Sequence, residues 1–461
     1  MLKFNGPIRI GQTPLIVLVV LILAVLPQTA EALEFRLDGY YRFRADFWDN
    51  MSLDREAENS DGVRTVLEHR LRLAPHFRLS SNVHVYADFD VMDALTFGSN
   101  PEVLAAAGAL QETGQAFDEP LPLSDSVLPG SDYRESVFVR RAWAEVYTPY
   151  VDLKIGRMGN HWGMGLFAND GNGENANFGD TVDRIMVSTS ALDPVRISLA
   201  VDTRAEGFIN RNDDTHSFLL SGGYLGELHQ IGGYVRWTRQ PSNSFNLVHG
   251  DLYGATKLGP LSLQLEALIL WGSALDTDIG VEDLTILAGG GALDAQLSIS
   301  PIEVGLQVGL ATGDSDPSDN AWHTMRFDRD HDIALILFED PLPQHTVGEF
   351  ADSSNANIDL SQAVTGNAVS NAFYFTPSFH VTPIDNLTAG VRLVAAWPVV
   401  PEAFGDHAPK FYGAEVDFDV SWLLYGNFEL AGEIGIFLPG AVFGEDLDPV
   451  IGAEIRAQVH F

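Results

Sequence analysis

The sequence predicts an all-β fold: a single transmembrane antiparallel up-and-down β-barrel of about 18 strands. Three observations lead to this prediction: apolar and polar residues alternate in many segments, very short connections alternate with long ones, and the chain begins like an exported protein. The C-terminal segment 450–461 shows the alternation most plainly. One face of this ribbon carries Ile451, Ala453, Ile455, Ala457, Val459 and Phe461, and the other carries Gly452, Glu454, Arg456, Gln458 and His460.

Residues 1–32 have the pattern of a cleaved signal peptide. Lys3 and Arg9 precede the apolar run Leu15–Leu26, and Ala30-Glu31-Ala32 is a small-x-small cleavage site. The run is shorter than the roughly 20 residues that span a bilayer as a helix, so cleavage is favoured over a retained anchor. We therefore expect a signal at 1–32 and one barrel domain at 33–461, located in the outer membrane of a Gram-negative bacterium.

The alternation begins with the mature chain and repeats along it. Residues 33–47 hold a period of two that an amphipathic helix would break, because a helix would mix the two sets on every face. Repeating the procedure predicts eighteen strands, with a range of 16 to 20. They lie near 33–47, 64–79, 83–92, 136–148, 150–158, 181–191, 195–204, 217–226, 229–239, 245–258, 261–271, 284–299, 302–312, 371–382, 386–397, 411–424, 428–438 and 450–461.

The connections between these strands support a membrane barrel. One set is very short, as at Ser80-Ser81-Asn82 and Gly259-Pro260, and the other contains the long loops 93–135, 159–180 and 313–370. Short periplasmic turns and long extracellular loops are typical of outer-membrane barrels. A soluble β-solenoid or sandwich, the rival fold, would not require the lengths to alternate.

Charge and composition narrow the classes of partner. The formal net charge of −36 argues against nucleic-acid binding, which needs a basic face. The absence of cysteine removes disulfides and thiolate metal sites. The expected partners are outer-membrane lipid and lipopolysaccharide around the barrel and small polar or anionic solutes inside it. No cofactor is expected.

If the apolar parity faces lipid, the polar parity lines the lumen, and that parity is rich in arginine. The sequence therefore predicts a porin-like channel for passive diffusion of polar or anionic solutes. Two alternatives stay open: cross-strand Arg–Asp and Arg–Glu pairs that only rigidify the wall, and a structural or adhesive barrel with a plugged lumen and partner-binding loops. The predicted pore-lining residues are Arg36, Arg42, Arg44, Arg64, Arg70, Arg72, Arg141, Arg157, Arg196, Arg236, Arg392 and Arg456.

The long connection 313–370 contains an apolar patch, 333–338, within an acidic setting. An apolar stretch in an outer loop must bury itself, so we expect it to fold into the lumen as a constriction. An additional strand pair is the alternative. The constriction candidates are Ile333, Leu335, Leu337 and Phe338. In the loop 93–135, Val103–Gln111 is a short helix candidate.

Few motifs suggest other chemistry. Oxygen ligands occur at alternate positions in Asp170, Asn172 and Glu174, as they do in a calcium loop. The glycine and glutamate of an EF-hand are missing, so a plain Asn/Gly-rich loop is the favoured interpretation. No Gly-x-Ser-x-Gly or comparable nucleophile motif is present, so the sequence indicates no enzyme.

Three stretches carry a resemblance to known proteins: 154–165, with its Gly-Arg followed by a Trp-Gly loop, 178–184, and the hairpin 412–439 with the terminal Phe461. In these the chain resembles Gram-negative porin-like outer-membrane proteins, especially the large barrels grouped with alginate-export proteins. It is also similar to uncharacterised myxobacterial-type outer-membrane proteins. The resemblance implies an outer-membrane channel of eighteen strands and transfers no substrate residues.

Overall fold

The computed structural model describes residues 33–51, 53, 55, 63–96, 137–173, 176–205, 214–241, 244–275, 283–316, 319–339, 342, 368–404 and 408–461. The predicted signal 1–32 and the helix candidate Val103–Gln111 lie outside these ranges. Among the described residues, no helix is long and apolar enough to cross a membrane.

Eighteen long strands form the wall, as the alternation predicts. Their bounds are β1 Glu34–Asp49, β2 Arg64–Arg78, β3 Val83–Thr96, β4 Val137–Tyr147, β5 Val151–Gly159, β6 Thr181–Thr189, β7 Val195–Ala205, β8 Thr215–Leu225, β9 His229–Gln240, β10 Phe245–Leu258, β11 Leu261–Ala274, β12 Leu284–Ile299, β13 Ile302–Ala311, β15 Ala372–Ile384, β16 Leu387–Pro398, β17 Gly413–Leu424, β18 Phe428–Pro439 and β19 Val450–His460.

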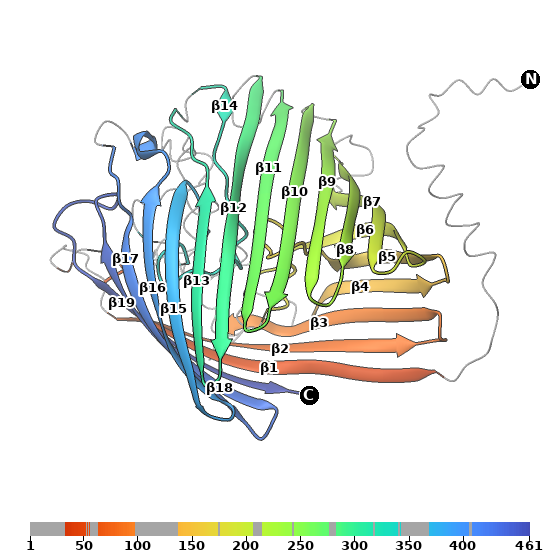
Figure 1. The fold of residues 1–461 in the computed structure, drawn as a ribbon, viewed down its shortest axis with the longest axis horizontal. Helices are drawn as coiled ribbons and strands as arrows, with labels where there is room; N and C mark the ends of the chain where they lie inside the picture. The colour runs from red at the N-terminus through yellow and green to blue at the C-terminus, as the bar shows by residue number, and fades with distance from the viewer. Residues whose placement is uncertain are drawn as a thin grey trace, which may run out of the picture.

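Each strand pairs antiparallel with its neighbour in sequence, and β1 pairs with β19 to close the barrel (Figure 1). The closing register runs from Tyr40 opposite His460 to Asp49 opposite Ile451. Beyond it, Gly39 and Phe461 exchange two backbone hydrogen bonds of 2.9 and 3.0 Å. The sheet therefore has no free edge along these strands, which is what a β-structure in lipid requires.

The remaining elements are small. β14, Ala321–Trp322, pairs parallel with Thr285 and Ile286 of β12, and η2 is a single 3₁₀ turn at Pro401–Phe404. β14 is not a member of the barrel wall. The alternative of an additional strand pair in 313–370 is therefore wrong for the described part of that connection.

The two ends of the barrel differ. At one end the strands are joined by short turns, such as Gly259-Pro260, where Gly259 has a φ of 64° that favours glycine. At the other end lie the long connections. We call these the short-turn end and the long-loop end. The first residues of β1 pair with the last of β2 beside a short turn, so β1 begins at the short-turn end, where β19 also ends.

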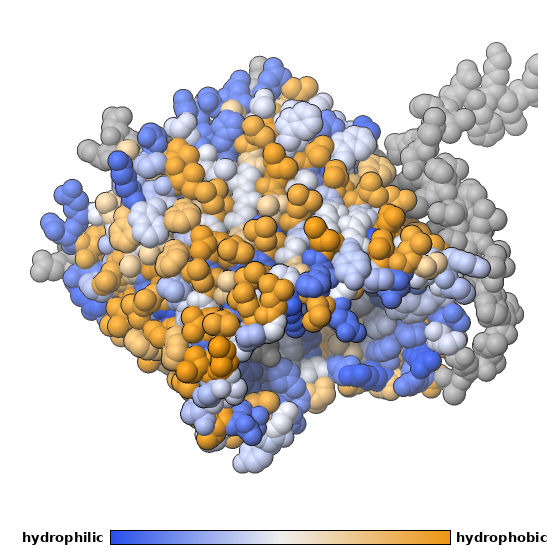
Figure 2. Space-filling view, in the orientation of Figure 1, coloured by the Kyte–Doolittle hydropathy of each residue, from blue (hydrophilic) through white to orange (hydrophobic). Residues whose placement is uncertain are grey.

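The outer face of the wall is apolar. Side chains on the predicted lipid-facing parity are exposed, among them Phe35, Ile455 and Val459, and Figure 2 shows apolar residues over much of the strand surface. Trp271 and Trp237 are also exposed there, as expected for aromatic residues at a membrane interface. The opposite parity carries buried polar and charged groups, so the barrel is apolar outside and polar inside.

This orientation can be tested with spin labels at Phe35, Ile455 and Val459, with Ser421 on the inner face as the matched control. In bilayers we expect the three outer labels to be relaxed by lipid-soluble oxygen and shielded from a water-soluble nickel chelate, because they face hydrocarbon. The Ser421 label should show the reverse. Relaxation-enhancement spectroscopy measures both accessibilities, and water exposure of the outer labels would contradict the orientation.

Candidate functional site

The interior of the barrel is partly filled by two loops from the long-loop end. The first inward loop, the described residues of 160–180, connects β5 to β6, and the second inward loop, the described residues of 312–371, connects β13 to β15. Both contact inner-face residues of the wall. Together they define the space in which any solute would meet the protein.

Arginines of β1 and β2 hold the first inward loop. Arg42 and Arg70 each donate an Nη1 hydrogen to the carbonyl oxygen of Ala176, at 3.2 and 3.1 Å. Arg70 Nη2 also donates to the carbonyl oxygen of Asn177 at 3.0 Å. Charged donors make stronger hydrogen bonds than neutral ones, and both arginines are buried, so these contacts fix the loop to the wall.

Two neighbouring residues of β4 hold the other side of the same loop. Arg140 Nη2 donates to the carbonyl oxygens of Asp170 at 3.0 Å and Phe178 at 2.7 Å, and Arg141 also donates to Asp170. Adjacent strand residues normally point to opposite faces. Here the register between β3 and β4 shifts by one residue, a β-bulge that lets both arginines reach the loop. The sequence prediction missed Arg140 because strict alternation places it outside.

Buried ion pairs within the wall occupy further arginines. Arg72 makes a two-pronged contact with Asp90 at 2.6 and 2.8 Å. Arg184, which the sequence prediction did not include, makes the same contact with Asp202 at 2.6 and 2.9 Å. Two parallel hydrogen bonds fix the guanidinium plane. These pairs fit the alternative in which cross-strand arginines rigidify the wall.

The oxygen atoms of the candidate calcium loop serve the loop itself. Asn172 Nδ2 donates to Asp170 Oδ2 at 2.7 Å, and Asn172 Oδ1 accepts a hydrogen bond from Arg141 at 2.9 Å. Glu174 lies outside the described residues. A guanidinium beside these oxygens repels a divalent cation, so the arrangement does not favour calcium between them.

The apolar patch of the second inward loop is buried inside the barrel. Ile333, Ile336, Leu337 and Phe338 are fully buried, and Leu335 packs beside them. Burying each such side chain contributes about 1.5–3 kcal/mol. The cluster around them includes Met325, Phe327, Val369, Tyr374, Tyr412, Phe437, Phe443 and Val450.

One carboxylate of the wall anchors this patch. Glu415 of β17 accepts the backbone N–H groups of Leu335, Ile336 and Leu337 at 3.0, 2.8 and 2.8 Å. The neighbouring inner-face positions are glycines, and a Cβ added at Gly452 would lie 2.9 Å from Ile336. The loop backbone can therefore lie close against β17, β18 and β19.

The two inward loops also bind each other. Asp330 Oδ1 accepts the N–H groups of Asn177 and Phe178 at 2.8 and 3.1 Å. The guanidinium of Arg329 lies 4.3 Å from the centre of the Phe178 ring. The loops thus form one connected assembly inside the wall.

The structure places two predicted pore-lining arginines elsewhere. Arg36 lies on the inner parity but is exposed near the short-turn end, where it pairs with Asp38 at 2.8 Å. Arg157 pairs with Asp183 at 2.8 Å on the face of β5 that carries Ile155, opposite to the face of Lys154. The pore-lining prediction is therefore wrong for Arg157. Arg157 comes three residues after Lys154, and residues three apart on a regular strand point to opposite faces.

The other predicted arginines are on the inner parity with polar partners, except that the side chain of Arg64 lies outside the described residues. Arg44 pairs with Glu68, the residue directly opposite it on β2. Arg236 contacts His249 at 3.2 Å and the ring of Phe167. The remaining pairs are Arg196 with Asp152, Arg392 with Asp417 and Glu433, and Arg456 with Glu429 and Glu454.

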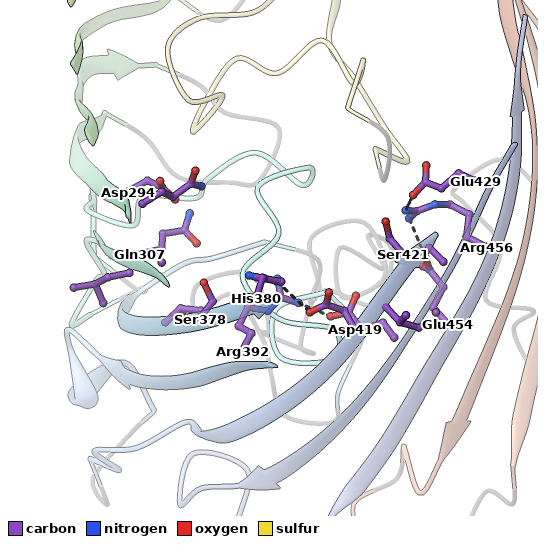
Figure 3. Close-up of a pocket in the computed structure, with 18 residues that line it drawn as sticks. Asp294, Gln307, Ser378, His380, Arg392, Asp419, Ser421, Glu429, Glu454 and Arg456 are labelled. Atoms are coloured by element: carbon purple, nitrogen blue, oxygen red, sulfur yellow. Dashed lines mark hydrogen bonds and ion pairs between the residues drawn. The ribbon is translucent and has the colours of Figure 1, made fainter. Parts of the chain in front are cut away.

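Two cavities open on the inner wall. The first, of about 420 Å³, is lined by β12, β13 and β15–β19, with Asp419, Arg392 and Glu454 among its charged residues (Figure 3). The second, of about 360 Å³, is lined by β4–β6, β8, β9 and the first inward loop and carries Lys154 and Arg184. Either volume is large compared with the roughly 30 Å³ of a water molecule.

No protein-family model and no curated protein matches the chain. Solved structures do. OccK8 (OprE) of Pseudomonas aeruginosa superposes with a TM-score of 0.52 at 10% identity, over 93% of this chain and 98% of that one. A BenF-like porin from Pseudomonas fluorescens Pf-5 gives 0.54 at 10% identity, over 94% and 100%. The chain has the fold of a porin barrel.

A third structure, P. aeruginosa OccK2 (OpdF) in complex with glucuronate, gives a TM-score of 0.52 at 10% identity, over 93% of this chain and 96% of that one. At this identity the likeness concerns the fold. The resemblance to alginate-export and myxobacterial-type proteins stays a prediction.

Burial shifts the pKa of three groups in the second inward loop. It raises the pKa of Asp328 to about 7 and that of Asp332 to about 6. It lowers the pKa of His331, whose Nε2 lies 2.8 Å from the Tyr374 hydroxyl, to about 4. Burial disfavours the charged form in each case.

Replacing Glu415 should release the apolar patch. In Glu415→Gln, one carboxylate oxygen becomes an amide donor that cannot accept the loop N–H groups, at an expected cost of about 2 kcal/mol in local stability. That corresponds to roughly thirty-fold faster amide hydrogen exchange at Leu335–Leu337, measured by mass spectrometry. Glu303→Gln is the control, because Glu303 accepts a hydrogen bond from Ser298 and lies away from the loop. Unchanged exchange in Glu415→Gln would contradict the anchoring role.

The loop should also respond to pH through Asp328. A carboxyl whose folded pKa is raised to about 7 stabilises the folded loop below its unfolded pKa near 4, and this contribution is lost as pH rises through about 7. His331 acts in the opposite direction, so the comparison needs Asp328→Asn. We measure the protection of the backbone amides of 325–339 against hydrogen exchange, corrected for the intrinsic exchange rate at each pH. We expect this protection in the wild type to fall relative to that in the variant between about pH 4 and 7. Parallel profiles would contradict the assignment.

Proposed function

We propose that the chain is a porin-like channel of a Gram-negative outer membrane, through which small polar solutes, anionic ones included, diffuse passively. The observation that carries the proposal is a closed barrel with an apolar outer face and a charged interior that retains two cavities of about 420 and 360 Å³. A barrel of 16–18 strands is wide enough for an aqueous channel.

The location follows from the same arrangement. The apolar outer face would contact outer-membrane lipid and lipopolysaccharide, with the short-turn end toward the periplasm. The proposed signal at 1–32 would deliver the chain there, and 33–461 would form the barrel. The solved neighbours support this only through their shared fold.

The inward loops would set the width of the path. In this proposal Ile333, Leu335, Leu337 and Phe338 act as a constriction because they fix the second inward loop against the inner wall. Arg42, Arg70 and Arg141 act mainly by holding the first inward loop. Lys154, which pairs with Glu145 at 2.8 Å, and Arg184 line the second cavity, where a carboxylate-bearing solute would have to share these cations with their acidic partners. Glucuronate, bound in the OccK2 structure, is one such solute.

A second candidate is a structural or adhesive barrel whose lumen is plugged and whose loops bind partners. The observation that favours it is the apolar cluster that joins the second inward loop to β11–β13, β15, β16, β18 and β19. A path closed by buried apolar packing conducts no ions, so conductance separates the two candidates.

Planar-bilayer recording of the refolded barrel tests the channel. We expect discrete conductance steps from the wild type and larger steps when 333–338 is replaced by six alternating glycines and serines, because the constriction loses its apolar anchor. Replacing Ser80-Ser81-Asn82 at the short-turn end by glycines is the control and should leave the steps unchanged. A folded barrel without conductance, confirmed by heat-modifiable gel migration, would favour the plugged barrel.

A further inference from the structure

Four carboxylates stand side by side on the inner wall. Across β17, β18, β19 and β1, Asp419 lies directly opposite Glu433, Glu433 opposite Glu454, and Glu454 opposite Asp46. Like charges directly opposite on neighbouring strands are destabilising. A row of this kind therefore needs positive charge close by, from the protein or from a ligand.

The protein supplies only part of that charge. Arg392 contacts Glu433 at 2.6 Å but also Asp417 at 3.1 Å, and Arg456 is shared between Glu454 and Glu429, each at 3.3 Å. Arg44 lies 3.2 Å from Asp46 and 4.0 Å from Glu454, and His380 pairs with Asp419 at 3.3 Å. Each of these guanidiniums therefore serves at least two carboxylates, so the carboxylates outnumber the arginines that neutralise them.

The first cavity adjoins this row. Five carboxylates line it against two arginines and His380, so its charge is net negative whether or not His380 is protonated. Figure 3 shows His380 and Arg392 on one side of Asp419, and Arg456 near Glu429 and Glu454. The sign is opposite to that of the arginine-lined lumen that the sequence predicts.

A second, independent feature points to a ligand. Thr376 of β15 lines the same cavity and is only 3% exposed, and its Oγ1 has no hydrogen-bond partner among the described residues. A buried hydroxyl without a partner costs free energy that a bound polar group would recover. Gln307 and Ser378 lie beside it on the same wall and offer further donors and acceptors (Figure 3).

The shape of the cluster favours an organic cation over a metal ion. No three histidine, aspartate or glutamate side chains converge as a metal site among the residues that the structure describes. Calcium takes six to eight oxygen ligands at short range. A cavity of about 420 Å³ with spread carboxylates instead suits an ammonium or guanidinium group carried by a small molecule.

We propose that the first cavity is a binding subsite for the cationic group, ammonium or guanidinium, of a small organic or zwitterionic solute. Asp419 and Glu433 bind the cation, and Thr376 accepts or donates a hydrogen bond to the same solute. The role of the subsite in transport rests on the proposed channel function, whereas binding to the folded barrel does not.

L-arginine and L-citrulline are the matched probes, because they have nearly the same size and citrulline carries an uncharged urea in place of the guanidinium. Calorimetry on the folded barrel in detergent should show arginine binding about tenfold more tightly than citrulline. In the double variant Asp419→Asn/Glu433→Gln that preference should disappear. Thr376→Val should weaken both ligands by a similar factor and keep the preference.

Asp183→Asn is the control, because it removes one negative charge from the outer face of β6, away from the cavity, and should leave arginine binding unchanged. Equal affinities for arginine and citrulline, or equal losses in Asp183→Asn and the double variant, would overturn the subsite. Calcium binding at these carboxylates without arginine preference would also overturn it.

Planar-bilayer recording with the same probes separates this inference from the channel. Conductance steps without any arginine preference leave the channel standing and overturn the subsite. Arginine-selective binding by a barrel that never conducts supports the subsite and overturns the channel. Arginine-dependent interruptions of the current, lost in Asp419→Asn/Glu433→Gln, support both.

Discussion

The constraint on which the structure depends is that every backbone donor and acceptor facing hydrocarbon must be paired within the protein. A sheet with an open edge cannot meet it, and the pairing of β1 with β19 removes that edge. Closure then assigns each side chain by parity. One set is exposed to lipid and must be apolar, and the other is enclosed and is free to be charged.

The enclosed charges are used first to build the interior. Arg42, Arg70 and Arg140 donate to carbonyl groups of the first inward loop, and Glu415 accepts the N–H groups of the second. Loop backbone inside a barrel has no strand partner of its own, so wall side chains satisfy it. The charged side chains that remain to contact a solute are mostly acidic at the first cavity and of both signs at the second.

The wall could be predicted almost completely from the sequence, because alternation and turn length are local signals. The interior could not. The alternation rule failed at Arg140, where a bulge inserts one residue. Arg157 was predicted to line the pore although the same rule places it on the outer face, where it pairs with Asp183. That the patch 333–338 is buried followed from its apolar character, but its acceptor, Glu415, lies about eighty residues later. The carboxylate row depends on the registers of four strands, which no single strand encodes.

The anchorage of the second inward loop has a consequence for assembly. Within that loop, the patch 333–338 bonds to Glu415 and lies against Gly435 and Gly452, on β17, β18 and β19, all of which follow it in the chain. The first inward loop is held from both sides of the sequence, because β1, β2 and β4 precede it and Glu266 of β11, which accepts the N–H group of Met164, follows it. When strands join in chain order, the patch 333–338 gains its seat only as the last strands arrive. Insertion of the final hairpin and docking of this patch are therefore coupled.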